Sequence, residues 1–179
     1  MRIMTFNLRS DFIFDGKNRW KNRKHIVHEI LNHYACDIIG LQEVTTRMRH
    51  DLEGMLEDYQ IVGEARSKKL FVEHNNLLIS KRYKIIEEET FWLSNTPQKV
   101  GSSIWYSIFP RICTTVKVEL EGGTVIRIYN THLDCYLSPA RKYGLKKIMR
   151  YIAKQHELEH IPVVLALMHI SEPTRGLRI

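Results

Sequence analysis

Hydrophobic and polar residues follow two different periods along this 179-residue chain. A period of two, or a short apolar run bounded by polar residues, predicts β-strands. Residues 77–80 and 83–89 are close enough in sequence to pair as a hairpin. The expected strands are 2–8, 37–44, 59–63, 77–80, 83–89, 114–120, 125–129 and 162–167.

A period of 3.6 residues indicates helices between these strands. Apolar side chains recur at helical spacing between residues 20 and 34. A second helix is expected to begin with Ser138 as its N-cap and to reach about residue 156. A short helix is expected at residues 52–56. The alternation of strands with helices predicts an α/β fold.

Several expected strands end in side chains that form hydrogen bonds. The first strand ends at Asn7, a later one ends at Glu43, and Asn130, His132 and Asp134 follow the strand 125–129. Ligands of α/β proteins bind beyond the carboxyl ends of strands, so these side chains are candidates for one site. Capping of the strand ends is the alternative interpretation. A carboxylate beside a second polar strand end favours a metal ligand at Glu43.

A long aromatic segment without periodicity spans residues 90–110. Loops of this length are uncommon in compact domains unless they bind something. Its aromatic side chains either stack on a base or sugar or hold the loop in place. Arg111 follows, at the start of a strand, where its guanidinium would hold a phosphate. Glu73 and Asn75 are weaker candidates for the same cleft.

Composition narrows the class of protein. At 44% hydrophobic residues, the chain is long enough for one core, so residues 1–179 are expected to form a single domain. No apolar run approaches the roughly 20 residues that span a bilayer, and the N-terminus has no signal-peptide pattern, which predicts a soluble, cytoplasmic protein. The formal charge of +7 suits a phosphorylated substrate or a nucleic acid, although surface lysines also serve solubility.

Six segments together resemble the endonuclease/exonuclease/phosphatase superfamily, the deoxyribonuclease I-like proteins. The pieces Leu-Gln-Glu-Val and Asn-Thr-His-Leu-Asp are the most specific, and Phe-Trp-Leu-Ser and Pro-Arg-Ile-Cys-Thr are similar to a bacterial branch. In family order, the segments are residues 4–9, 18–23, 37–44, 90–94, 110–114 and 130–134. The resemblance implies a four-layer α/β sandwich of two central sheets flanked by helices.

The resemblance also implies hydrolysis of a phosphodiester or phosphomonoester with a divalent metal, Mg²⁺ or alternatively Mn²⁺. Glu43 resembles the metal carboxylate of the family, and Asn7 the neighbour that orients metal and phosphate. His132 resembles the residue that contacts the scissile phosphate or assists the leaving group. The implied substrate contacts are Arg111, Asn130 and Asp134.

The chain departs from the family pattern after residue 165. The family continues with Gly-Asp-Phe-Asn and later a Ser-Asp-His segment, whereas this chain reads Ala-Leu-Met-His-Ile over residues 166–170 and ends at Ile179. We therefore expect a C-terminally incomplete domain, from a truncated or frameshifted gene, with weak or no activity. His169 is the candidate substitute ligand.

Two further expectations follow from an incomplete domain. Open sheet edges recruit other chains, so a homodimer or aggregation is expected. The alternative function is a non-catalytic module that binds a phosphorylated ligand or a nucleic acid.

Overall fold

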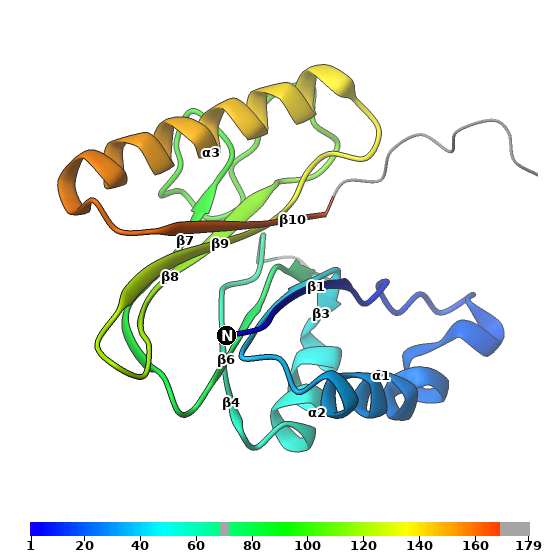
Figure 1. The fold of residues 1–179 in the computed structure, drawn as a ribbon. Coiled ribbons are helices and arrows are strands. Elements are labelled where there is room, and N and C mark those ends of the chain that lie inside the picture. The colour runs from blue at the N-terminus through cyan, green and yellow to red at the C-terminus, as the bar shows by residue number, and fades with distance from the viewer. Residues whose placement is uncertain (69–71, 169–179) are drawn as a thin grey trace, which may run out of the picture.

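The computed structural model describes residues 1–68 and 72–168. Two four-stranded sheets lie face to face, with helices on both outer faces (Figure 1). In the first sheet the order is β1 (Ile3–Asn7), β2 (Ile38–Gln42), β6 (Leu77–Ser80) and β4 (Tyr59–Val62). In the second it is β10 (Val163–Met168), β9 (Val125–His132), β8 (Ile112–Glu119) and β7 (Lys84–Trp92). This arrangement confirms the expected four-layer α/β sandwich.

Helices cover the outer face of the first sheet. α1 (Trp20–Tyr34) follows a short 3₁₀ helix (Gly16–Asn18), and α2 (Thr46–Met55) lies beside α1 (Figure 1). α1 buries Trp20, Val27 and Leu31, which helical spacing places on one face. These side chains pack in one cluster with apolar residues of β2 and α2.

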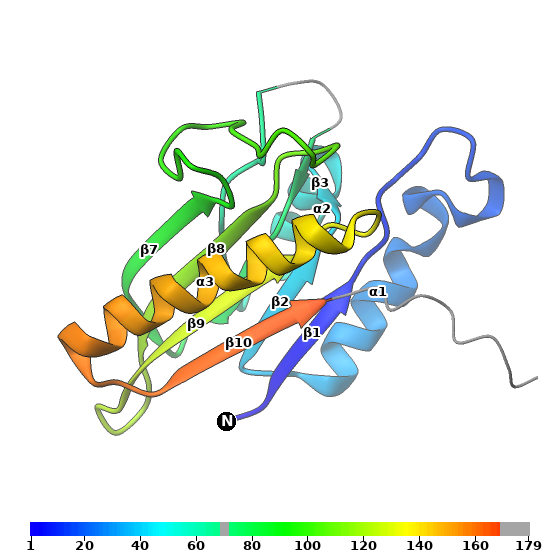
Figure 2. The ribbon, with the colours of Figure 1, turned by 90° about the horizontal axis from the view of Figure 1, so that it is seen from above.

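α3 (Ser138–Glu159) covers the second sheet (Figure 2). It buries Ala140, Gly144 and Ile148, and a Cβ atom at Gly144 would lie 3.1 Å from side-chain atoms of both Leu93 and Leu133. No helix within the described ranges is long and apolar enough to cross a membrane. The cytoplasmic location stays a prediction.

An apolar layer fills the space between the two sheets. Leu77 and Ile79 of β6 lie in this layer with Val116 of β8 and Ile128 of β9. Because side chains alternate along a strand, each of these strands sends every second residue inward. Burial of such a side chain stabilises the fold by about 1.5–3 kcal/mol.

One buried amide links the sheets at the end of this layer. Nδ2 of Asn130 in β9 donates hydrogen bonds to the carbonyl oxygens of Leu41, at 2.9 Å, and Asn76, at 2.8 Å. Oδ1 of Asn130 accepts a hydrogen bond of 2.7 Å from Nε2 of Gln42. Asn130 is 0% exposed, so the structure corrects its expected role as a substrate contact. The hydrogen bonds of this amide instead hold the two sheets together.

Gly40 in β2 makes room for this amide. A Cβ atom at residue 40 would lie 2.9 Å from Oδ1 of Asn130 and 3.0 Å from Cβ of Ala166. Contacts that close force neighbouring atoms to shift. The absence of a side chain therefore allows the two sheets to approach at this position.

The expected hairpin of residues 77–80 and 83–89 is wrong. β6 pairs antiparallel with β2 and β4, whereas β7 pairs with β8 in the other sheet. The chain crosses between the sheets over residues 81–83, and Tyr83 is buried in the layer between them. A short connection is compatible with a hairpin or a crossing, and the buried side chains decide in favour of the crossing.

α2 is longer than the expected helix at residues 52–56. It begins at Thr46, and the Thr45 hydroxyl accepts a hydrogen bond of 3.3 Å from the backbone N–H of Met48. This is an N-cap contact, which satisfies one of the free N–H groups at a helix start. Met48 and Leu52, one turn apart, form its buried face.

The strands β1 and β10 are terminal strands of the two sheets within the described ranges. They lie side by side at one edge of the sandwich (Figure 2). Ile3 of β1 and Val164 of β10 are only partly buried there. The homodimer or aggregation expected at such an edge stays a prediction.

The amide link between the sheets generates a stability prediction. Asn130→Ala removes three buried hydrogen bonds that join the sheets, so we expect the free energy of unfolding to fall by about 2–4 kcal/mol. Urea unfolding followed by circular dichroism measures it. Asn18→Ala, at an exposed asparagine, is the matched control and should change stability by less than about 0.5 kcal/mol. Equal stability of the two variants would contradict the structural role of Asn130.

Candidate active site

Glu43 follows β2 directly and adopts a left-handed backbone conformation, with φ of 58°. Such a conformation costs a non-glycine residue about 1–3 kcal/mol and persists only where surrounding contacts impose it. Oε1 of Glu43 accepts a hydrogen bond of 2.8 Å from Nδ2 of Asn7, and Oε2 accepts one of 3.0 Å from the backbone N–H of Ser10. β1 and β2 are parallel neighbours, so their carboxyl ends bring Asn7 and Glu43 together.

His132, the last residue of β9, joins this pair from the second sheet. Its Nε2 atom lies 3.5 Å from Oε1 of Glu43, and the residue is 5% exposed. Burial lowers the pKa of His132, and the positive charge of Arg111 lowers it further, against the opposing effect of Glu43 and Glu73. The imidazole is therefore neutral at neutral pH.

A second carboxylate lies next to Glu43 and is connected to it through Ser10. The two-stranded sheet of β3 (Val44–Thr45) and β5 (Glu73–His74) places Glu73 at this end of the molecule. Oε1 of Glu73 accepts a hydrogen bond of 2.5 Å from the Ser10 hydroxyl, and Oε2 accepts one of 2.6 Å from Nη1 of Arg66. Glu73 was only a weak candidate from the sequence, and Ser10 was not singled out, because hydroxyls in loops carry no periodic signal.

Arg111 precedes β8 and is 8% exposed. Its Nη2 atom donates to the Cys135 sulfur at 3.6 Å, and its Nε atom lies 3.8 Å from Oδ2 of Asp134. Arg66 approaches from the neighbouring loop, with Cζ 4.8 Å from the ring centroid of Phe109. Two guanidinium groups therefore lie on the His132 side of the cluster.

Asp134 is buried and holds loops rather than facing the cleft. Oδ1 accepts hydrogen bonds from the backbone N–H groups of Tyr136 and Leu137, at 2.9 and 2.8 Å, and Oδ2 accepts one of 2.9 Å from the Ser107 hydroxyl. Burial raises the pKa of Asp134, but these hydrogen bonds and the charge of Arg111 outweigh burial and hold the pKa below its usual value. At 1% exposure Asp134 supports Arg111, which corrects its expected role as a substrate contact.

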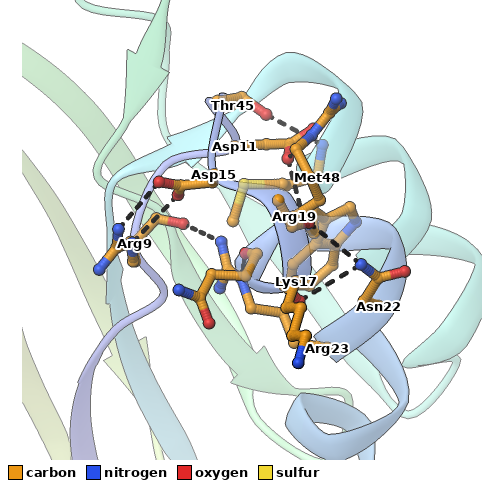
Figure 3. A network of polar contacts seen from close by, with 12 residues as sticks. Arg9, Asp11, Asp15, Lys17, Arg19, Asn22, Arg23, Thr45 and Met48 are labelled. Carbon is orange, nitrogen blue, oxygen red and sulfur yellow. Dashed lines mark hydrogen bonds and ion pairs between the residues drawn. The ribbon is translucent and has the colours of Figure 1, made fainter. Parts of the chain in front are cut away.

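The loop that carries Ser10 is fixed by paired charges (Figure 3). Arg9 donates two hydrogen bonds to Asp15, of 3.1 and 2.9 Å, and Arg19 donates two to Asp11, of 2.7 and 2.9 Å. Oδ1 of Asp11 also accepts the backbone N–H of Trp20 at 2.9 Å, where α1 begins. The hydrogen bonds from Arg19 are the main reason that the pKa of Asp11 is lowered. The exposed Arg9 pair contributes little stability, but both pairs restrict the loop.

The geometry thus unites three of the residues proposed from sequence. Asn7, Glu43 and His132 meet at the carboxyl ends of strands from both sheets, with Arg111 beside them. His169, the expected substitute ligand, lies outside the described residues.

Comparison with known proteins identifies the family of this chain. The model of the endonuclease/exonuclease/phosphatase family matches residues 4–156. The chain belongs to this family. A crystal structure of an endonuclease/exonuclease/phosphatase from Bacteroides vulgatus is 30% identical, with a TM-score of 0.88, over 97% of this chain and 67% of that chain.

Two other relatives differ more in sequence or length. A mannosyl-6-phosphatase from Bacteroides thetaiotaomicron is 25% identical, with a TM-score of 0.86, over 92% of this chain and 63% of that chain. A protein of Acanthamoeba polyphaga mimivirus is 32% identical over 71 residues, 35% of this chain and 10% of that protein. The chain spans about two thirds of the length of the two bacterial structures.

The donor set of this endonuclease/exonuclease/phosphatase site suits one kind of metal ion. Within residues 1–68 and 72–168, no group of three or more histidine, cysteine, aspartate or glutamate side chains is placed to hold a metal. Zinc sites need three or four such ligands, so the described residues do not fit zinc. Mg²⁺ keeps several waters and needs only one or two carboxylates together with substrate phosphates. Glu43, with its partly exposed carboxylate, fits that requirement.

The low pKa of Asp134 generates a prediction about pH. The pKa is lower in the folded than in the unfolded chain, so the charged carboxylate stabilises the fold above about pH 4, and this stabilisation is lost as pH falls through the folded pKa. Asp134→Asn should therefore lose stability mainly above pH 4, and the difference from wild type should shrink in acid. Urea midpoints from about pH 2.5 to 7 measure this, with Asp58→Asn, at an exposed carboxylate, as the control. A stability difference that grows in acid would contradict the assignment.

Proposed function

We propose that this chain hydrolyses a phosphate ester with the help of a divalent metal ion, Mg²⁺ or Mn²⁺ in its place. The observation that carries the proposal is the convergence of Asn7, Glu43 and His132 from two sheets on one point. Membership of the endonuclease/exonuclease/phosphatase family supports a phosphoester as the substrate class. The relative named a mannosyl-6-phosphatase supports the same class.

Glu43 is the residue that would hold the metal ion. A bound Mg²⁺ supplies positive charge that neutralises phosphoryl oxygens as the ester is attacked. Asn7 and the Ser10 backbone each donate to one oxygen of the Glu43 carboxylate, which fixes its orientation before substrate arrives. A fixed carboxylate needs no reorganisation when the ligand binds, which favours catalysis.

His132 and Arg111 act on the substrate side in this proposal. The neutral imidazole can donate a hydrogen bond to a phosphoryl oxygen without bringing a second positive charge close to the metal. Arg111 adds a permanent charge from a buried position, where electrostatic interactions are stronger than in water. Asp134 and Cys135 hold the Arg111 guanidinium from behind.

A second candidate function is a module that binds phosphorylated ligands or nucleic acid without cutting them. The favouring observation is the series of lysines and arginines along the exposed side of α3, in a chain with formal charge +7. Binding of this kind weakens with salt, with a log–log slope of about −0.9 per phosphate contact. It requires no metal ion, which separates it from the first proposal.

Substitution of Glu43 tests the catalytic proposal directly. Glu43→Gln should abolish hydrolysis of chromogenic phosphate mono- and diesters, because the neutral amide is a much weaker ligand for Mg²⁺. Initial rates with Mg²⁺, on protein shown to be folded by circular dichroism, measure it. Glu121→Gln, at an exposed glutamate in the turn after β8, is the matched control and should keep full activity. Unchanged turnover in Glu43→Gln would refute the assignment.

Removal of the metal provides an independent test. A chelator should stop wild-type hydrolysis, and excess Mg²⁺ or Mn²⁺ should restore it. Turnover that persists in chelator would contradict the proposed chemistry. A folded protein without turnover at any metal concentration, but with salt-sensitive binding of phosphorylated ligand, would favour the binding module.

A further inference from the structure

Three loops at one end of the sandwich expose large apolar side chains. One loop follows β1, a second joins β7 to β8, and a third joins β9 to α3 (Figure 2). The register places the second and third loops at the same end, because Trp92 pairs with Ile112 and Cys113 pairs with Thr131. This is the end that carries the candidate active site. Their most exposed apolar side chains, here called the apolar rim, are Phe12, Ile13, Phe14, Trp105, Ile108 and Tyr136.

Two of these loops are joined by the buried carboxylate of Asp134. Its Oδ2 atom accepts a hydrogen bond of 2.9 Å from the Ser107 hydroxyl of the second loop. Its Oδ1 atom accepts hydrogen bonds from the backbone N–H groups of Tyr136 and Leu137 in the third loop, at 2.9 and 2.8 Å. The first loop is held in turn by its arginine–aspartate pairs. The rim is therefore presented by loops with fixed positions.

The side chains of the rim stand clear of the protein surface. Phe14 is 97% exposed and Trp105 is 92% exposed, whereas Trp20 and Trp92 are 1% and 2% exposed. Single exposed apolar residues are ordinary, but several gathered on adjoining loops mark an interaction surface. Side chains that are almost fully exposed line no pocket, so their partner must be a surface.

The chain around the rim is basic. Exposed lysines follow or precede each group of apolar side chains, and the two aspartates of the first loop, Asp11 and Asp15, are each paired with an arginine. These lysines are Lys17, Lys21, Lys99 and Lys142. No aspartate or glutamate occurs in residues 16–28, 90–118 or 135–156. The partner surface should therefore be anionic as well as apolar.

We propose that the apolar rim docks this protein onto an anionic lipid surface, with the site end of the sandwich facing the bilayer. Aromatic side chains at separate loop tips can each enter the headgroup region, and lysines beside them attract anionic headgroups. A protein partner would instead need one continuous, closely fitted surface. Docking of this kind goes beyond the proposed function, which requires only a phosphate ester in solution.

Tryptophan fluorescence tests the docking directly. Of the three tryptophans, only Trp105 is exposed, so a change in emission on binding reports the rim. Vesicles of mixed phosphatidylcholine and phosphatidylserine, added in chelator, should shift the emission to shorter wavelengths and should co-sediment with the protein. Vesicles of phosphatidylcholine alone should bind at least about tenfold more weakly, and added salt should weaken binding to the anionic vesicles.

Serine substitutions in the rim remove apolar surface from exposed positions and should leave the fold intact. Phe14→Ser and Trp105→Ser should each weaken co-sedimentation with anionic vesicles by roughly tenfold or more. Leu158→Ser is the matched control, because Leu158 is 71% exposed but lies at the far end of α3 (Figure 2). This control should bind vesicles as the wild type does.

Paired lysine substitutions separate the charge of the rim from the net charge of the chain. Lys17→Gln combined with Lys21→Gln should reduce the preference for anionic vesicles. Lys81→Gln combined with Lys84→Gln removes the same charge from the turn between β6 and β7, at the opposite end of the sandwich. This second pair should keep wild-type binding, since electrostatic attraction falls off within a Debye length of the surface.

The outcomes separate this proposal from the proposed function. Absence of vesicle binding, or equal binding by the two rim variants and the Leu158→Ser control, would overturn the docking surface even if metal-dependent hydrolysis occurs. Self-association that both rim variants abolish, without vesicle binding, would overturn it in favour of a protein contact. Vesicle binding requires neither metal nor turnover, so Glu43→Gln should bind vesicles although it loses hydrolysis.

Discussion

The hydrogen bonds of the Asn130 side chain set the position of one sheet against the other. Nδ2 of Asn130 binds the Leu41 carbonyl at 2.9 Å, and two residues further along each strand lie His132 and Glu43. Because the link lies only two residues before both side chains, it constrains the 3.5 Å approach of His132 to Glu43. An amide of this kind is directional, whereas the apolar layer between the sheets would tolerate sliding. The site therefore depends on a residue that does not belong to it.

Several local costs in free energy occur at the same end of the sandwich. Glu43 has a positive φ, and Arg111 and His132 each keep a buried nitrogen without a partner. Similar costs also occur elsewhere, since Ala35 and His160 at helix ends have positive φ, and the buried hydroxyls of Thr115 and Tyr129 lack partners within the described ranges. Natural proteins break local rules chiefly where function requires it. Part of these costs thus coincides with the proposed chemistry.

The arginines near the site illustrate how charge can be buried without loss of its use. Arg66 is paired with Glu73 and Arg111 lies beside Asp134, so neither guanidinium is left alone in the protein. A buried charge without a partner would destabilise the fold strongly. Each pairing still leaves donors unused, and both side chains line a narrow recess next to His132. In the proposed function, the atoms that anchor each arginine therefore differ from those left for a substrate.

The sequence by itself determined most elements of this protein and the residues of its candidate site. Periodicity placed most strands and the long helices, and polar strand ends identified Asn7, Glu43 and His132 without any structure. Periodicity could not decide which group each inward-facing side chain contacts. Asn130 and His132 point to the same side of β9. Asn130 contacts the first sheet, whereas His132 lies beside Glu43 at the carboxyl ends of the strands. Periodicity reports the side of a strand but not the group that lies opposite.

Tertiary structure alone decided the remaining features. The crossing between sheets at residues 81–83 depends on which layer buries Tyr83, and the sequence on either side would suit a hairpin equally well. Ser10 and Arg66 reach the site from irregular loops, whose position follows from contacts with residues far along the chain. Long-range pairing has no local signature, because its energy is gained only when the two sheets meet.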